Sequence, residues 1–229
     1  MESTVRPISV AIDGPSAAGK STVARAAARH FGFRYVDTGA IYRTVGLAVQ
    51  RAGIDPRDPA AVAALLPGLD IGLDYDGQGV QRMLLGGEDV SEVIRSPQCS
   101  IYASDVSALP EVRAFLMETQ RSIARRCSVV MDGRDIGTVV LPEAEVKIFL
   151  TASAEERARR RCLELREKGM ETPFDEVLRD IEYRDRQDTE RAAAPLRAAE
   201  DAVLLDTGGM SLEESIAAVC RIIEKEAAQ

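Results

Sequence analysis

Short apolar runs rich in β-branched residues recur along the chain, separated by longer amphipathic stretches. The runs lie at 8–12, 34–37, 128–132, 146–151 and 203–206, and each predicts a buried parallel strand. The stretches between them space apolar residues three or four positions apart and predict helices at 20–31, 38–52, 59–66, 97–107, 110–126, 154–167, 173–189 and from 211 onward. Strands that alternate with helices predict an α/β fold with a parallel sheet covered on both faces.

Local signals mark where several of these helices begin and end. Gly32 is expected to end the first helix, and Thr38 is expected to cap the second. Ser211 and Glu214 have the spacing of a capping box at the start of the last helix.

The segment 68–95 breaks this alternation. Ile71, Leu73 and Tyr75 alternate with polar or small residues, a turn follows at 76–79, and a second run covers 80–85. This pattern predicts a small antiparallel insert within one domain that spans residues 1–229.

Residues 14–21 match the pattern G-x-x-x-x-G-K-[ST] in full, between a predicted strand and a predicted helix. The N–H groups of such a loop point at phosphate oxygens, and the helix N-terminus adds partial positive charge. Lys20 is expected to bridge the β- and γ-phosphates, and Ser21 to ligate Mg²⁺. The residues expected to bind the nucleotide are Gly14, Pro15, Ser16, Ala17, Ala18, Gly19, Lys20, Ser21 and Thr22.

Asp132 ends another apolar run and is expected to lie near the metal, as strand-terminal aspartates do in P-loop proteins. A capping carboxylate is the alternative interpretation. The chain lacks the N-K-x-D motif that reads guanine, which argues against a GTP switch.

Basic residues gather after these same strands and predict a second anion site. Arg43 follows a strand exit by about one helical turn, and Arg134 lies directly after Asp132 and Gly133. Two further sets share a helix face, namely Arg184, Asp188 and Arg191, and Arg157 with Arg161. Solvated helices with surface ion pairs are the alternative, but together the arginines favour a basic lid over transferring phosphates.

Composition narrows the classes of partner. The chain has 229 residues, a net charge of −8, no Trp and 4% aromatic residues, so a nucleic-acid polymer or an anionic membrane is a poor partner. We see neither a secretion signal at the first residues nor an apolar run long enough for a membrane span. The four cysteines are widely spaced, which predicts reduced thiols in a cytoplasmic protein, and His30 is expected at the surface.

Five motifs together resemble the bacterial cytidylate kinases, a family of P-loop nucleoside monophosphate kinases. They are IDGPS at 12–16 leading into the phosphate loop, DTGAIYR at 37–43, GGEDVS at 86–91, DGRDIGT at 132–138, and Arg191 with APL at 194–196. The resemblance implies a five-stranded parallel core, a monophosphate-binding insert that corresponds to about 68–95, and a helical lid at about 153–172. Ala17 stands where many members have Gly, and a negative φ is expected there because alanine disfavours positive values.

The resemblance also implies the reaction and its residues. ATP with Mg²⁺ would phosphorylate CMP or dCMP, giving CDP or dCDP, a reaction of pyrimidine metabolism, and we expect the enzyme to be a monomer. The catalytic set would be Lys20, Arg134, Asp132, Arg157 and Arg161, with Ser21 and Asp132 at the metal. Substrate binding would fall to Thr38, Tyr42, Arg43, Ser104, Arg113, Arg134, Asp135, Arg184, Asp188 and Arg191. Within this set Arg43, Arg134 and Arg191 would hold the phosphate, Ser104, Arg113 and Asp135 the cytosine, and Arg184 and Asp188 the ribose.

Two alternatives stay open from the sequence. One is a kinase on the same core that acts on UMP, AMP or shikimate. The other is a regulatory protein that uses ATP only as a switch, which the arginines of the second site disfavour because a switch needs one phosphate pocket.

Overall fold

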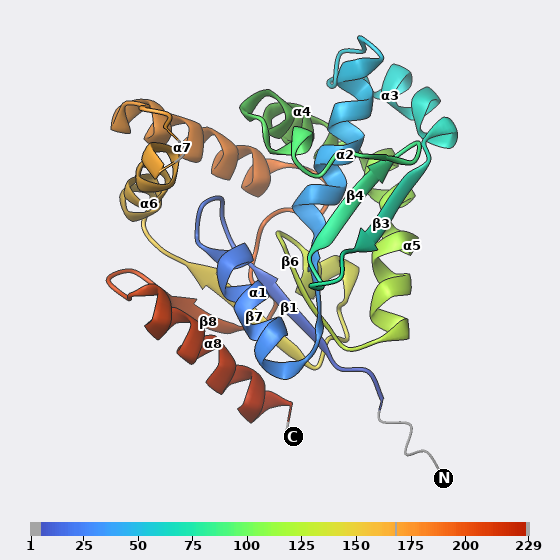
Figure 1. Cartoon of the computed structure of the whole chain (residues 1–229). Coiled ribbons are helices and arrows are strands. Elements are labelled where there is room, and N and C mark those ends of the chain that lie inside the picture. The colour runs from blue at the N-terminus through green and yellow to red at the C-terminus, as the bar shows by residue number, and fades with distance from the viewer. Residues whose placement is uncertain (1–5, 168, 228–229) are drawn as a thin grey trace.

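A five-stranded parallel sheet forms the centre of the computed structural model, which describes residues 6–167 and 169–227. The strand order is β2 (Arg34–Asp37), β6 (Val129–Gly133), β1 (Ser9–Asp13), β7 (Val146–Thr151) and β8 (Val203–Asp206) (Figure 1). The predicted parallel sheet is therefore confirmed. All of its crossovers place the carboxyl ends of the strands at one edge, where ligands bind in such sheets.

Helices cover both faces of this sheet because the side chains of each strand alternate between them. Val10 and Ile12 of β1 pack with α1 (Lys20–Phe31) and α8 (Leu212–Glu226). Ala11, between them, belongs to the cluster on the other face, with α2 (Thr38–Arg51) and α5 (Pro110–Arg126). Burying both faces explains why apolar residues dominate the strands.

The predicted insert is a three-stranded antiparallel sheet of β3 (Ile71–Tyr75), β4 (Gln81–Leu85) and β5 (Glu88–Asp89). It follows α3 (Pro59–Leu65) and a short 3₁₀ turn at Leu66–Gly68, and it precedes another 3₁₀ turn at Val93–Arg95. The next helix, α4 (Pro97–Ser107), packs closely on α2. Gly46 of α2 allows this contact, since a Cβ there would lie 2.9 Å from the backbone nitrogen of Ala103.

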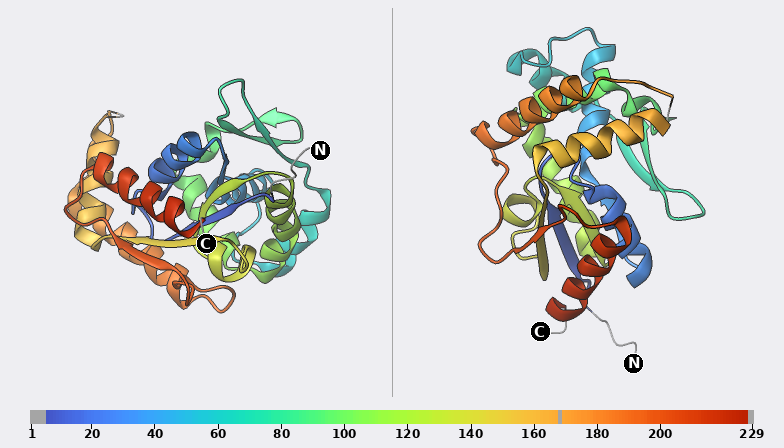
Figure 2. Two further views of the ribbon diagram at one scale, coloured as in Figure 1. Left: turned by 90° about the horizontal axis from the view of Figure 1, so that it is seen from below. Right: turned by 90° about the vertical axis from the view of Figure 1, so that its left-hand side faces the viewer.

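The helices α6 (Ala154–Glu167) and α7 (Phe174–Glu190) form a pair beyond the end of β7 (Figure 2). Ala158, Leu165, Val177 and Ile181 pack between them, and Ala17 of the phosphate loop lies against this cluster. The pair therefore reaches over the carboxyl edge of the sheet.

Three local details differ from the sequence predictions. Asp37, not Thr38, caps α2, because its carboxylate accepts from the Ala40 N–H while the Thr38 hydroxyl donates to the Asp132 carbonyl. Ala17 has a φ of +58°, against the expected negative value. A π-helix at Ile136–Val140 stands where no element was predicted.

The expectations for the cysteines and for His30 hold within the described residues. The four cysteines are free, and His30 is exposed beside Glu224. Among these residues there is no helix with the length and hydropathy needed to cross a bilayer.

Candidate functional site

The phosphate loop connects β1 to α1 in a conformation that two glycines permit and in which one alanine has a positive φ. Gly14 passes so close to β7 that a Cβ would lie 1.9 Å from the Leu150 carbonyl oxygen. Gly19 has a φ of +85° directly before the helix. Ala17 also adopts a left-handed conformation, which costs an L-residue about 1 to 2 kcal/mol. The loop therefore stores strain at Ala17 that glycine would not carry.

Lys20 begins α1 and folds back across the loop. Its ammonium group donates to the Pro15 carbonyl oxygen at 2.7 Å and is almost fully buried. Burial, followed by the nearby Arg134 guanidinium, lowers the pKa of Lys20 well below its ordinary value. An anion in the loop would remove this penalty by supplying a counter-charge.

Asp132 is the next-to-last residue of β6 and lies beside the start of α1, where the sequence predicted a group near a metal. Its Oδ2 accepts from the Ser21 hydroxyl at 3.0 Å and its Oδ1 from the Tyr35 hydroxyl at 2.8 Å. Burial and the charge of Asp37 raise the pKa of Asp132 to about 6. A carboxylate and a hydroxyl oxygen in contact are hard donors of the kind Mg²⁺ takes, together with substrate phosphates and water.

A second buried aspartate fixes the strand exit that carries Arg134 and Asp135. The carboxylate of Asp13, the last residue of β1, accepts from the N–H groups of Ile136 at 2.8 Å and Gly137 at 2.7 Å. Burial, assisted by the Asp135 charge, raises the pKa of Asp13 to about 6 even though these hydrogen bonds lower it. Asp13 thus joins the phosphate loop to the π-helical turn opposite.

Arg134 bridges the phosphate loop and α7. It donates from Nη2 to the Ser16 hydroxyl at 3.0 Å and from Nε to Asp188 Oδ2 at 2.7 Å. The sequence placed both Arg134 and Asp188 in the site, and the structure brings them into direct contact. The guanidinium of Arg134 therefore faces the glycine loop rather than pointing away from it.

Asp135 anchors a second set of predicted residues further from the loop. Arg113 donates from Nη2 to Asp135 Oδ2, and Arg191 lies 3.4 Å from Oδ1. Arg191 also lies 3.6 Å from Asp188, so one buried network joins α5, β6 and α7. The Tyr42 ring packs under the Arg113 guanidinium, 5.5 Å from ring centroid to Cζ.

The remaining predicted arginines border this network. Burial and the Arg134 charge lower the pKa of Arg184 to about 10, with Arg43 and Arg161 also close enough to contribute. Within the described residues no carboxylate lies within ion-pair distance of Arg184, whereas Arg43 is 3.9 Å from Asp37. Ser104 joins the network through Ser107. The Ser107 hydroxyl donates to the Ser104 carbonyl oxygen, and the Ser107 carbonyl oxygen accepts from Arg113. These crowded guanidinium groups form a cluster whose charge suits an anion.

Arg157 and Arg161 have more specific partners than their shared helix face predicted. Arg157 is buried and donates to the carbonyl oxygens of Ser16 and Ala152, both at 2.9 Å, and pairs with Asp185. Arg161 pairs with Glu164 at 3.0 Å at the surface. In this arrangement Arg157 connects α6 to the phosphate loop.

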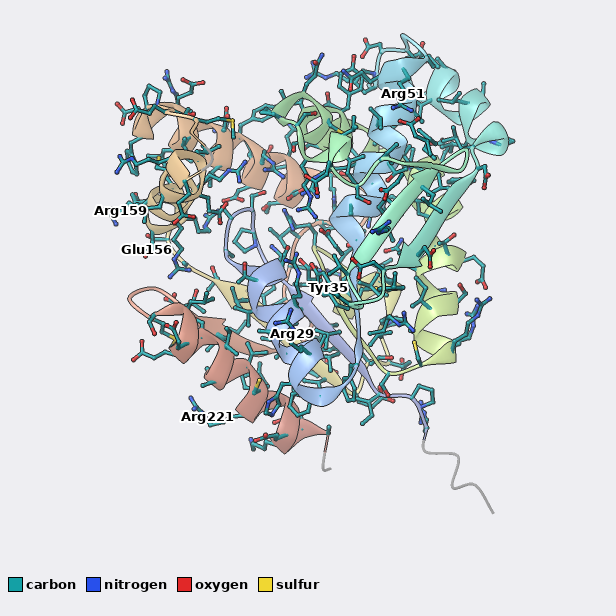
Figure 3. All side chains as sticks on the ribbon, viewed as in Figure 1. Arg29, Tyr35, Arg51, Glu156, Arg159 and Arg221 are labelled. Atoms are coloured by element: carbon teal, nitrogen blue, oxygen red, sulfur yellow. The ribbon has the colours of Figure 1, made fainter. Side chains whose placement is uncertain are left out.

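Three further site residues were missed by the sequence analysis, namely Asp13, Tyr35 and Asp185. Asp185 binds both the Ser16 N–H, at 3.3 Å, and Arg157. Tyr35 lies between α1 and the near end of the β3–β4 hairpin (Figure 3). Their signals were weak: a polar residue at a strand end, a tyrosine within a strand, and an aspartate beside the predicted Arg184.

Comparison with known proteins gives consistent results across the chain. A protein-family model described as Cytidylate kinase matches residues 10–225. The Cytidylate kinase of Carboxydothermus hydrogenoformans is 52% identical over 217 residues, 95% of this chain and 97% of that protein. The Cytidylate kinase of Lactiplantibacillus plantarum is 48% identical over 219 residues, 96% of each. A solved structure of an uncharacterized protein from Eubacterium ventriosum shares the fold, with a TM-score of 0.50 and 12% identity over 96% of this chain and 99% of that one.

Proposed function

This chain belongs to the cytidylate kinase family, and we propose how its site transfers the γ-phosphoryl group of ATP to CMP or dCMP. It is an ATP-dependent nucleoside monophosphate kinase that forms ADP and CDP or dCDP. The observation that carries the site assignment is Arg134, which touches Ser16 of the phosphate loop and Asp188 of α7 at once. That contact supports a donor site at the phosphate loop that faces an acceptor site beside α7.

The donor side is the phosphate loop with Lys20. Its N–H groups and the α1 N-terminus bind the phosphates of ATP, and Lys20 exchanges the Pro15 carbonyl for phosphate oxygens. Ser21 and Asp132 would hold Mg²⁺, which would neutralise charge on the phosphates. Tyr35 keeps Asp132 oriented through its hydroxyl.

The acceptor side receives the monophosphate among Arg43, Arg134 and Arg191. A monophosphate is already largely ionised at neutral pH, with a second pKa of about 6, so its oxygen attacks without a strong general base. Alignment and neutralisation of the equatorial charge then carry catalysis. Arg184 and Asp188 lie beside this pocket and suit the ribose hydroxyls.

Base recognition is assigned to Asp135, Arg113 and Ser104. Cytosine presents an amino donor beside two acceptors, which match a carboxylate and a guanidinium. Uracil carries a carbonyl where cytosine has its amino group, so it would face Asp135 with an unpaired acceptor. A site of this kind rejects the wrong base strongly because a buried polar group loses its partner.

The larger parts of the fold have corresponding roles. We assign monophosphate binding to the insert at 68–95 and lid closure to about 153–172, with Arg157 fixing α6 on the loop and Arg161 turning from Glu164 toward the phosphates. Closure excludes water, which would otherwise compete as the nucleophile. We further propose a monomeric enzyme of the cytoplasm.

Product identification with a panel of acceptors tests these assignments. ATP and MgCl₂ are mixed with CMP, dCMP, UMP, AMP or shikimate, and CDP and dCDP are the expected main products. Lys20→Ala is expected to abolish transfer with an unchanged circular dichroism spectrum, while Lys225→Ala, at an exposed lysine of α8, keeps full activity. Near-normal turnover by Lys20→Ala would remove the loop lysine from the mechanism.

A further inference from the structure

A cavity of about 370 Å³ lies next to the site described above, between α1, β2 and the β3–β4 hairpin, and shares Tyr35 and Asp37 with it. Four arginines border it: Arg25 and Arg29 from α1, Arg34 from β2, and Arg95 from the turn after the insert. Figure 3 shows Arg29 on α1 and Tyr35 between α1 and the hairpin. This size falls within the range of small-molecule sites, about 300 to 1,000 Å³.

The charge around this cavity is largely unbalanced. Arg95 forms an ion pair with Glu92 at 3.7 Å. Within the described parts of the chain, the other three arginines form no ion pair. Asp37 also borders the cavity, but its carboxylate caps α2. Four guanidinium groups therefore meet two carboxylates, those of Asp37 and Glu92, at a hollow in a chain whose net charge is −8.

Two of these arginines are held in place by aromatic rings rather than by acids. The Arg34 Cζ lies 4.1 Å from the centroid of the Tyr75 ring, and the Arg25 Cζ lies 5.4 Å from that of Tyr35. Stacking on a ring fixes a guanidinium while leaving its N–H groups available to an anion. The cavity also includes the apolar side chains of Phe33 and Val80, whose low polarity strengthens the local field.

We propose that this cavity binds a nucleotide-sized anion with two or more phosphate groups, at the same time as the donor and acceptor pockets are filled. Arg29 lies nine residues beyond Lys20 on the same helix, about 14 Å along its axis, so a ligand there does not overlap the phosphate loop. The two sites are nonetheless connected. Tyr35 borders the cavity and donates to Asp132, and Gln81, at its edge, accepts from the Asp37 N–H at 2.7 Å.

Equilibrium dialysis with two labels tests the proposal. The enzyme is saturated with CMP, MgCl₂ and the non-hydrolysable ATP analogue AMP-PNP, and differently labelled CTP is added as the probe. The expected result is one further equivalent of CTP per chain with AMP-PNP fully retained. Cytidine, which has no phosphate, is expected not to bind. CTP that binds only as AMP-PNP is lost, no bound CTP, or equal binding of cytidine would each overturn the proposal.

Paired variants assign the binding to this cavity. Arg29→Ala combined with Arg95→Ala is expected to weaken the second CTP equivalent at least tenfold without changing the rate of CDP formation. Arg126→Ala combined with Arg221→Ala removes two exposed arginines from α5 and α8 and is expected to leave CTP binding unchanged. If both double variants bind CTP like the parent, the anion binds elsewhere and the assignment is wrong.

Discussion

Protonation of Asp13 is expected to slow phosphoryl transfer below about pH 6 while it adds to the stability of the fold. The two oxygens of this buried carboxylate accept from the N–H groups of Ile136 and Gly137. Adding a proton converts one acceptor into a donor that faces an N–H group. The turn that follows Arg134 and Asp135 then loses one of its two anchors.

The effect on stability follows from the pKa of Asp13, which burial raises from 3.8 to about 6. Between these values the folded state binds more protons than the unfolded state, so the free energy of unfolding falls as pH rises through this window and is level above it. At about 1.4 kcal/mol per pH unit the full effect is about 3 kcal/mol. Between pH 7 and pH 4, the free energy of unfolding of the wild type is expected to rise by about 2 to 3 kcal/mol more than that of Asp13→Asn. Urea unfolding at the two pH values measures this difference.

The effect on activity is measured as the slope of log kcat/KM against pH at saturating MgCl₂. The phosphate of CMP also titrates near pH 6, and it does so equally in every variant. Asp13→Asn cannot titrate, so its limiting slope on the acid side is expected to be smaller than that of wild type by one proton. Its rate at pH 8 is also expected to be lower, because the amide accepts only one of the two N–H groups.

Asp76→Asn is the matched control for this experiment. Asp76 also accepts from two backbone N–H groups, those of Gln78 and Val80, but it is only partly buried and its pKa is lowered, with these hydrogen bonds as the main cause. Its variant is expected to keep the wild-type slope. An identical acid limb in wild type and Asp13→Asn would refute the idea that Asp13 holds the turn in its active position.

Three further substitutions test individual contacts of the site. Asp135→Asn is expected to reduce the preference for CMP over UMP in a coupled kinase assay, because the amide also donates to the uracil carbonyl; an unchanged preference would rule out Asp135 as the base-reading group. Gly133→Ala places a Cβ 2.7 Å from the Thr38 hydroxyl and is expected to lower unfolding free energy by about 1 to 3 kcal/mol, whereas Gly77→Ala, in open space, is neutral in the same urea titration. In the same titration, the unfolding free energy of Ala17→Gly is expected to be about 1 to 2 kcal/mol higher than that of Ala18→Gly. Of the two alanines only Ala17 has a positive φ, and the gain in unfolded-state entropy is common to both variants. Equal unfolding free energies would contradict strain at Ala17.

The sheet was predictable because each strand is a self-contained signal. A short β-branched run specifies a strand buried on both faces, and the order in which strands and helices alternate then fixes a parallel arrangement. The strand ends shifted by one residue, since Asp13 and Gly133 are paired into the sheet although their residue types resemble loops. The cap of α2 was misassigned because Asp37 and Thr38 both suit that position, and only the tertiary contact with the Asp132 carbonyl decides between them.

The sequence did not predict which side chains contact one another within the site. Local spacing placed Arg157 and Arg161 on one helix face, but the contacts of Arg157 with Ser16 and Asp185 join segments far apart in the chain. The π-helix at Ile136–Val140 likewise depends on Asp13, a residue on another strand. Such contacts arise only after the sheet has brought the strand ends together.

The balance of charge at the proposed acceptor site suits a dianion even though the protein as a whole is acidic. Five guanidinium groups border this site, those of Arg43, Arg113, Arg134, Arg184 and Arg191. Three carboxylates, those of Asp37, Asp135 and Asp188, pair with all of them except Arg184. Five positive charges less three negative charges leave an excess of two, which equals the charge of an ionised monophosphate. The carboxylates hold the guanidinium groups in position, since a buried cation without a partner is costly. Arg184, with its pKa lowered to about 10, has the most to gain when the phosphate enters.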